Sequence, residues 1–216
     1  MERIKRTDIL GESAWDAETK KAFFQNLLRS VNRAGTEELL SMLDRSDFYY
    51  APSSKNHHSN YRGGLLDHVL MVYETAMRVR DNIVNMNPNM EERLSEESVA
   101  VVSLLHDVCK ICFYKEAKKW RKDANGQWEE YDTYDVEDRF PIGHGEKSII
   151  ILQMYGYNLK VDEIIAIRFH MGMWDGMDKA TERSYQRAID MTPLLAVMIC
   201  SDYMSSMLLE EKIENK

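Results

Sequence analysis

Hydrophobic and polar residues follow the period of amphipathic helices over most of the chain. Over residues 16–32, for example, Phe23, Leu27 and Val31 recur on one side. Helix-start signals, such as acidic first turns, capping serine or threonine and proline at the first helical position, recur farther along. Further helices are predicted from Thr36, over 65–86, from Ser95 to His106-Asp107, over 143–155, over 160–170 and from Thr192 to about Ile213. The pattern predicts an all-α fold class.

Residues 113–134 break this helical pattern. Asn125-Gly126 is the strongest short hairpin signal, and the aromatic residues on both sides of it suit β-strands. We therefore predict a small inserted β-hairpin whose basic first arm pairs with its acidic second arm. The hairpin has two interpretations. It is either a phosphate-binding flap with Trp120 as a stacking platform, or a solvated element whose charges neutralise one another, which the small contribution of exposed ion pairs favours.

Length and composition bound the classes of function. The 216 residues, 44% hydrophobic and 30% charged, are typical of one folded domain spanning 1–216. The net charge of −8 argues against a protein that holds long nucleic acid by its phosphates, and leaves a small anionic substrate open. No apolar run approaches the ~18 residues of a membrane span. Three cysteines and no signal-peptide pattern predict a reducing, cytoplasmic location, and the oligomeric state is left open.

Several histidines and aspartates fall on apolar faces of the predicted helices, or directly follow them: His68, His106, Asp107, His170 and Asp202. A carboxylate that faces a helical core is costly unless it is compensated, and a metal ion bound by imidazole and carboxylate supplies that compensation. A single core histidine is more simply explained by an ordinary hydrogen bond, but the joint pattern favours one shared metal site. Neighbouring helix residues diverge by about 100°, so His106 and Asp107 reach one ion most readily near a helix end.

The order of these residues resembles a known signature. His68, then His106-Asp107, then Asp202 are similar to the H…HD…D signature of the HD superfamily of metal-dependent phosphohydrolases. The stretches GGLLDH (63–68) and LLHDVCK (104–110) are similar as well, the former especially to the HD domain of bacterial 3′-to-5′ exoribonucleases. The resemblance spans about residues 57–206, with 1–56 as an N-terminal helical extension, and implies an HD-type helical bundle.

The resemblance also implies a metal centre and a reaction. Two divalent ions of Mn, Fe, Co, Ni or Zn are implied, with Asp107 as the bridging catalytic ligand. One ion is held by His68, His106, Asp107 and Asp202, and the other by Asp107, His144 and His170. A one-metal site that His144 and His170 merely line is the alternative. The implied reaction is hydrolysis of a phosphate ester of a nucleotide or similar small molecule by metal-activated water.

Residues near these motifs are candidate substrate contacts. Lys110 lies four residues after His106 and shares its helix face. It is either a catalytic cation that binds a phosphoryl oxygen or a lysine that interacts with the negative end of the helix dipole. The candidate substrate-binding residues are His57, His58, Arg62 and Trp174. The first three suit phosphate contacts or proton donation, or plain loop surface, and the tryptophan suits a pocket wall or a turn.

Cys109 and Cys112 form a C-x-x-C pair. A structural zinc site needs two more ligands at a sensible spacing, and a redox pair of the thioredoxin type needs a βαβ context. The sequence offers neither of these, so we expect no separate zinc or redox function for the pair.

Two alternatives to hydrolysis stay open at this stage. A minority of the HD superfamily resembles di-iron oxygenases with four histidines and two aspartates, the number present here. The other alternative is a degenerate domain that senses a nucleotide without cleaving it. The exoribonuclease likeness is local, because that family carries an OB-type module where this sequence has residues 1–56. The expected partner is therefore a small phosphorylated substrate, a nucleotide or a short oligonucleotide.

Overall fold

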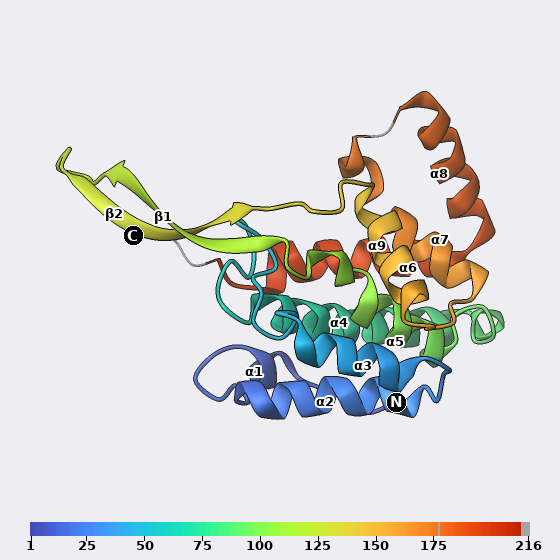
Figure 1. Cartoon of the computed structure of the whole chain (residues 1–216). Helices are drawn as coiled ribbons and strands as arrows, with labels where there is room; N and C mark the ends of the chain where they lie inside the picture. Colours follow the sequence, from blue (N-terminus) through green and yellow to red (C-terminus); the bar gives the residue numbers. More distant parts are fainter. Residues whose placement is uncertain (177, 213–216) are drawn as a thin grey trace.

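The computed structural model describes residues 1–176 and 178–212, and most of them are helical (Figure 1). The helices are α1 (Arg6–Ile9), α2 (Ala17–Ser30), α3 (Thr36–Arg45), α4 (Gly64–Met86), α5 (Glu96–Leu105), α6 (His144–Met154), α7 (Val161–Phe169), α8 (Lys179–Met191) and α9 (Pro193–Met204). Strands β1 (Tyr114–Lys122) and β2 (Trp128–Val136) form an antiparallel hairpin. The predicted helical fold with one small hairpin is confirmed.

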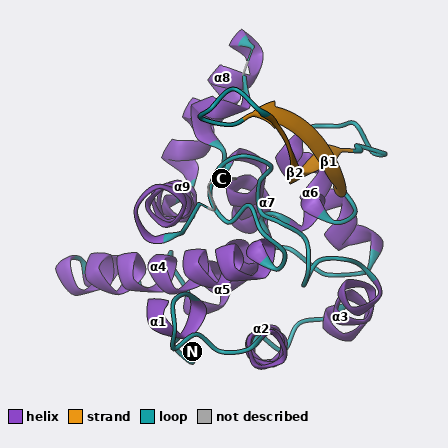
Figure 2. Ribbon diagram, turned by 90° about the vertical axis from the view of Figure 1, so that its left-hand side faces the viewer, coloured by secondary structure: helices purple, strands orange, loops and turns teal. Residues whose placement is uncertain are grey.

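Helix α4 lies at the centre of the molecule, and every residue from Gly64 to Met77 is buried. Helices α5 and α9 pack against it, and α2 lies on the side opposite α9 (Figure 2). One continuous cluster of buried hydrophobic residues runs from Ile4 near the N-terminus to Met198 in α9. The N-terminal helices therefore share their core with the helices that follow α4.

Local sequence sets the helix ends much as predicted. The Asp16 carboxylate accepts the backbone N–H of Thr19 at 2.7 Å and caps α2. The hydroxyl of Ser95 accepts the backbone N–H of Ser98 at 3.2 Å and caps α5. At α9, Thr192 is the cap and Pro193 the first helical residue. These caps fix where the helices that carry the candidate residues begin.

The hairpin projects away from the helices (Figure 1), and its charges pair across the strands. Lys118 Nζ lies 3.0 Å from Glu130, and Arg121 Nε lies 2.7 Å from Glu129. Trp120, the proposed stacking platform, is 63% exposed. The predicted pairing between a basic and an acidic arm is confirmed. The contacts favour a solvated element over a flap with free cations, because Lys118, Lys119 and Arg121 have acidic partners in the same hairpin.

Two helical predictions differ from the structure. Helix α8 was not predicted, and the face that it buries is narrow, with only Tyr185 and Ala188 buried. The terminal helix was expected to reach about Ile213, which lies outside the described residues. Helix α9 instead passes into a π-helical turn, Ser205–Leu209, and the chain becomes extended at Glu210. Because the helix ends there, the Glu210 side chain points inward toward His68.

Among the described residues, no single helix has both the length and the apolar character that crossing a membrane requires. Helices α8 and α9 with its π-helical extension meet that test only as a pair, across a bend of 106°.

Candidate metal centre

The six predicted ligand residues converge in the structure, although they come from five different helices. They are His68 in α4, His106 and Asp107 at the end of α5, His144 at the start of α6, His170 at the end of α7 and Asp202 in α9. Ligand atoms of these residues form overlapping groups in which all atoms lie within 4.8 Å of one another. His106 and Asp107 reach the same point because α5 ends between them, so the second residue is free of helical geometry.

One half of the cluster surrounds Nε2 of His68. This nitrogen lies 3.2 Å from Nε2 of His106, 3.3 Å from Oδ2 of Asp107 and 3.5 Å from Oδ1 of Asp202. The side chains of His68, His106 and Asp107 are almost completely buried, whereas Asp202 is 18% exposed. Two imidazoles and two carboxylates therefore meet within contact distance of one point.

The other half of the cluster lies on the far oxygen of Asp107. Its Oδ1 is 2.8 Å from Nε2 of His144 and 3.7 Å from Nε2 of His170. Its Oδ2 faces His68 and His106. Asp107 thus presents one carboxylate oxygen to each half of the cluster, which is the position that a bridging ligand requires.

Backbone carbonyls fix the orientation of two of the histidines. Nδ1–H of His106 donates to the carbonyl of Ser103 at 3.0 Å, and Nδ1–H of His170 donates to that of Ile167 at 2.7 Å. A carbonyl only accepts, so Nδ1 carries the proton and Nε2 keeps its lone pair. Nε2 of His170 is buried without a hydrogen-bond partner. A buried lone pair that faces carboxylates and other imidazoles is the donor arrangement that fits a divalent metal ion.

The local sequence holds these elements close together. A Cβ atom at Gly145 would lie 2.4 Å from the carbonyl oxygen of Arg168, so glycine allows α6 and α7 to bring their histidines side by side. The hydroxyl of Ser148 donates to the carbonyl of His106 at 2.5 Å and accepts the backbone N–H of Cys109 at 3.1 Å. Ser148 therefore satisfies the backbone at the end of α5 and ties that turn to α6.

Electrostatics keep the central carboxylate ionised. Burial would raise the pKa of Asp107, but the neighbouring Lys110 and His106 hold it well below its ordinary value. Burial would likewise lower the pKa of His68, but Glu210 and Asp107 raise it to about 10. The carboxylates beside His68 and His144 therefore favour the protonated form of these two imidazoles, and a bound cation would take the place of those protons.

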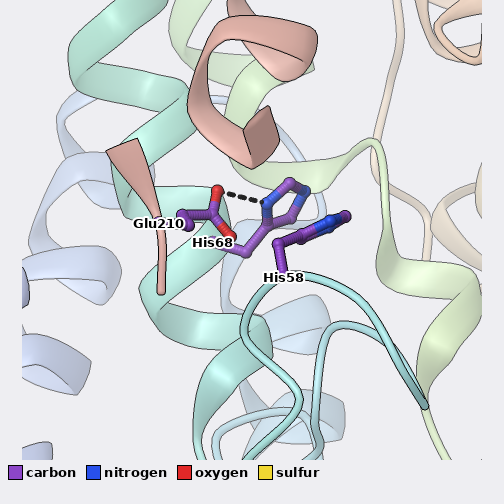
Figure 3. A group of neighbouring side chains, drawn as sticks. All are labelled: His58, His68 and Glu210. Carbon is purple, nitrogen blue, oxygen red and sulfur yellow. Dashed lines mark hydrogen bonds and ion pairs between the residues drawn. The ribbon is translucent and has the colours of Figure 1, made fainter. Parts of the chain in front are cut away.

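Sequence reasoning missed two residues of the centre. Glu210 accepts Nδ1–H of His68 at 2.8 Å (Figure 3); no helical pattern marks it, because it follows the end of α9. Cys109, considered only as half of a C-x-x-C pair, has its sulfur 3.4 Å from Nδ1 of His144. Its place two residues after Asp107 was an available signal. Its partner in the motif, Cys112, is exposed, so no second thiol joins Cys109 among the described residues.

The predicted substrate contacts divide into two groups. Nζ of Lys110 lies 2.6 Å from Oδ2 of Asp107, and the ring centroid of His58 lies 5.0 Å from that of His68. The structure does not bring the other three to the cluster. His57 is exposed, Arg62 is 67% exposed and lies 3.5 Å from Glu116 of β1, and Trp174 is 81% exposed. The partly exposed His144, 27% open, and Asp202 mark the side on which the cluster faces solvent.

Fold and site together define a mostly helical protein with a buried cluster of histidines and aspartates that could hold a metal ion. Residues 23–134, more than half of the chain, match the model of the TraI_2 family, which carries the description "putative helicase". The chain belongs to this family. No curated protein and no solved structure matches it.

This family assignment corrects the sequence-based resemblance. The match covers His68 and His106-Asp107, the residues on which the resemblance to the HD superfamily was built. The identification of the chain as a member of that superfamily, with its likeness to bacterial exoribonucleases, is therefore wrong. The physical reason is that any helical protein with a buried polar cluster needs a few histidines and aspartates on its inner helix faces. A pattern of so few residues therefore does not specify a family.

Metal binding is expected to strengthen as the pH rises from about 6.5, the ordinary pKa of histidine. The pKa values of His68 and His144 are raised to about 10. Their protonated forms stabilise the metal-free fold fully below pH 6.5, and that contribution is lost as the pH rises through about 10. A cation that displaces these protons therefore binds better at higher pH.

Thermal unfolding with and without Mn²⁺, measured at several pH values above 6.5, checks this. Metal at ~100 times its Kd adds about 2.7 kcal/mol, which raises the Tm of a chain of this size by roughly 5–10 °C. A Tm that does not respond to metal, or a shift that shrinks as the pH rises, would contradict the prediction.

Proposed function

We propose that this protein is a metal-dependent phosphohydrolase that cleaves the phosphate ester of a nucleotide or similar small molecule. The observation that carries the proposal is the convergence of four imidazole Nε2 atoms on the two oxygens of a buried, ionised Asp107. A metal ion in such a centre supplies a water molecule of lowered pKa and stabilises negative charge on phosphoryl oxygens. Hydrolysis of a phosphate ester uses both of these properties.

The proposed centre holds two divalent ions. His68, His106 and Asp202 with Oδ2 of Asp107 would hold one, and His144 and His170 with Oδ1 of Asp107 the other. Histidine and carboxylate ligands suit Mn, Fe, Co, Ni or Zn. The distances around Asp107 support this division, because each of its oxygens faces a separate set of imidazole nitrogens.

The residues of the chain would act on the substrate from the partly exposed side. Lys110 is 13% exposed, and its ammonium group contacts Asp107 at 2.6 Å and the hydroxyl of Ser53 at 3.3 Å. An ammonium group at this point can bind a phosphoryl oxygen and neutralise the charge that develops on it. Nε2 of His58 is buried without a hydrogen-bond partner near the same centre. Burial lowers the pKa of His58 to about 3, so its imidazole stays neutral and suits a hydrogen bond to the substrate.

The family description adds nucleic acid to the substrates worth testing. A helicase acts on nucleic acid, and a phosphodiester is also a phosphate ester. The sequence contains no match to the G-x-x-x-x-G-K-[ST] pattern of a nucleotide-binding loop. The proposal therefore rests on the histidine and aspartate centre, with short oligonucleotides included among the candidate substrates.

A substrate screen tests the proposal. Metal-free protein is loaded separately with Mn²⁺, Fe²⁺, Co²⁺, Ni²⁺ or Zn²⁺ and incubated with phosphomonoesters, nucleotides and short single-stranded oligonucleotides. We expect release of phosphate or of a shortened product with at least one metal, and none in the presence of excess chelator. Oxygen uptake coupled to turnover would instead identify an oxygenase, and a nucleotide that raises the Tm without being cleaved would identify a sensor.

Replacing His144 or His170 with alanine is expected to lower the bound metal from about two ions per chain to one. Each variant loses one of the two imidazoles proposed for the second ion and keeps the residues proposed for the first. Elemental analysis of the purified variants beside the wild type measures the ratio. A ratio that does not change in either variant would refute the two-metal centre.

A further inference from the structure

The imidazole of His68 is held between two sets of carboxylates. Nδ1 lies 2.8 Å from Oε1 of Glu210, whereas Nε2 lies 3.3 Å from Asp107 and 3.5 Å from Asp202. The side chains of His68 and Glu210 are 1% and 0% exposed, so water does not compete for these contacts. The proton of a neutral His68 can therefore take one of two places, on Nδ1 facing Glu210 or on Nε2 facing the cluster.

Only one of these two tautomers suits a metal ligand. With the proton on Nδ1, Nε2 keeps its lone pair and points it at the cluster. With the proton on Nε2, the imidazole donates to Asp107 or Asp202, and the lone pair points away from the cluster. Glu210 offers the closer carboxylate, and it lies on the Nδ1 side (Figure 3). Its contact favours the metal-binding tautomer and fixes the plane of the ring.

Glu210 is itself held in place at its second oxygen. Oε2 accepts the hydroxyl of Ser59 at 2.7 Å, and the backbone N–H of Ser59 donates to the carbonyl of Glu211 at 2.8 Å. Ser59 is buried against the start of α4, where a Cβ atom at Gly64 would lie 2.0 Å from its carbonyl oxygen. Both carboxylate oxygens of Glu210 thus have a donor, and the loop before α4 fixes the backbone that follows it.

A second backbone contact ties the segment to the N-terminal helices. Nε of Arg6 in α1 donates to the carbonyl of Leu209 at 2.7 Å. Residues 209–211 are therefore anchored on both sides of the Glu210 side chain, by α1 and by the loop before α4. We name this segment, residues 209–211, the C-terminal strap. It places the Glu210 carboxylate beside Nδ1 of His68, on the side of the ring that faces away from Asp107 and Asp202.

We propose that Glu210 is a positioning residue that sets the tautomer and the ring orientation of His68, and that the C-terminal strap completes the metal centre. The inference rests on the proposed metal centre and makes it dependent on a residue outside the two proposed sets of ligands. It assigns a role to a side chain that the proposed reaction does not otherwise use.

Co²⁺ binding tests the proposal without recourse to activity. We expect Glu210→Ala to weaken Co²⁺ binding about 10–100-fold, the usual cost of losing a partner of a ligand histidine. Affinity is measured by competition with a chromophoric chelator, and the visible absorption of the bound Co²⁺ reports its ligand geometry. Glu210→Gln, whose amide oxygen can still accept from Nδ1, should recover part of the affinity. Ser59→Ala should give a smaller loss than Glu210→Ala.

Glu211→Gln is the matched control. Its side chain is 58% exposed, and the substitution keeps the backbone carbonyl that Ser59 contacts. We expect this variant to bind Co²⁺ like the wild type. Circular dichroism of each variant shows whether it is folded, and Glu210→Gln, being nearly the same shape, serves if Glu210→Ala does not fold.

Each outcome separates this inference from the proposed function. If the wild type binds Co²⁺ and the Glu210 variants match it in affinity and absorption spectrum, the positioning role is wrong and the proposed function is untouched. If the wild type binds no transition metal, the metal centre fails and this inference falls with it. A loss of affinity in Glu210→Ala with partial recovery in Glu210→Gln supports the role.

Discussion

Asp107→Asn is expected to abolish metal binding and turnover together. Both oxygens of Asp107 face imidazole nitrogens, at 3.3 Å from His68 and 2.8 Å from His144, so the substitution removes the one negative charge shared by the two halves of the centre. Metal affinity should fall by more than about 10–100-fold, which is the usual cost of removing a residue that only hydrogen-bonds to a metal ligand. Elemental analysis and turnover, measured on the same preparation, check the prediction.

Asp67→Asn is the matched control for Asp107. Asp67 is also a buried carboxylate, 8% exposed against 3% for Asp107, and its partner Lys20 lies 2.6 Å away, as Lys110 does from Asp107. It precedes His68 in α4 but bonds to Lys20 and to the hydroxyl of Tyr61 rather than to the cluster. We expect this variant to lose stability and to keep its metal. Metal retained by Asp107→Asn, or lost equally from both variants, would remove Asp107 from the centre.

Lys110→Met is expected to lower turnover about 100–1000-fold while the metal content stays the same. This range is the usual effect of removing one group that stabilises developing charge. Burial would lower the pKa of Lys110, but Asp107 raises it above its ordinary value, so the ammonium stays charged. The methionine side chain keeps most of the volume of the lysine and removes only its charge.

Lys147→Met provides the comparison for Lys110. Lys147 is another buried lysine, 7% exposed, whose Nζ contacts Asp138 at 2.6 Å and lies over the ring of Phe113. Turnover is measured for both variants beside elemental analysis, and we expect Lys147→Met to match the wild type. Loss of metal from Lys110→Met would show that Lys110 supports Asp107 instead of contacting substrate.

The helices could be predicted because they follow from local periodicity, and the same periodicity placed several polar residues on buried faces, so that one shared site was the simpler expectation. His68 and Asp202 repeat with the apolar residues of their helices, and the positions buried by that pattern do meet in the structure. The end of α5 at His106-Asp107 was likewise readable, because a run of apolar residues stops there.

What could not be predicted depends on contacts between distant parts of the chain. Glu210 is buried by an ion pair with His68 and a hydrogen bond from Ser59, and no pattern near Glu210 reports either partner. Arg62 was expected to face the substrate, but its guanidinium lies over the ring of Tyr50 and beside Glu116. The family was also beyond reach, since four signature residues and two short stretches around them do not contain enough information to distinguish one family from another.

The strap has a consequence for how the protein assembles. His68 and Glu210 are 142 positions apart in the chain, so their contact closes one of the longest loops in the molecule. Closing such a loop costs more chain entropy than closing a short one, and contacts of high sequence separation form slowly in folding. We therefore expect the contacts of His68 with the C-terminal residues Asp202 and Glu210 to be the last part of the centre to become ordered. Metal would then bind a nearly finished fold instead of guiding its early steps.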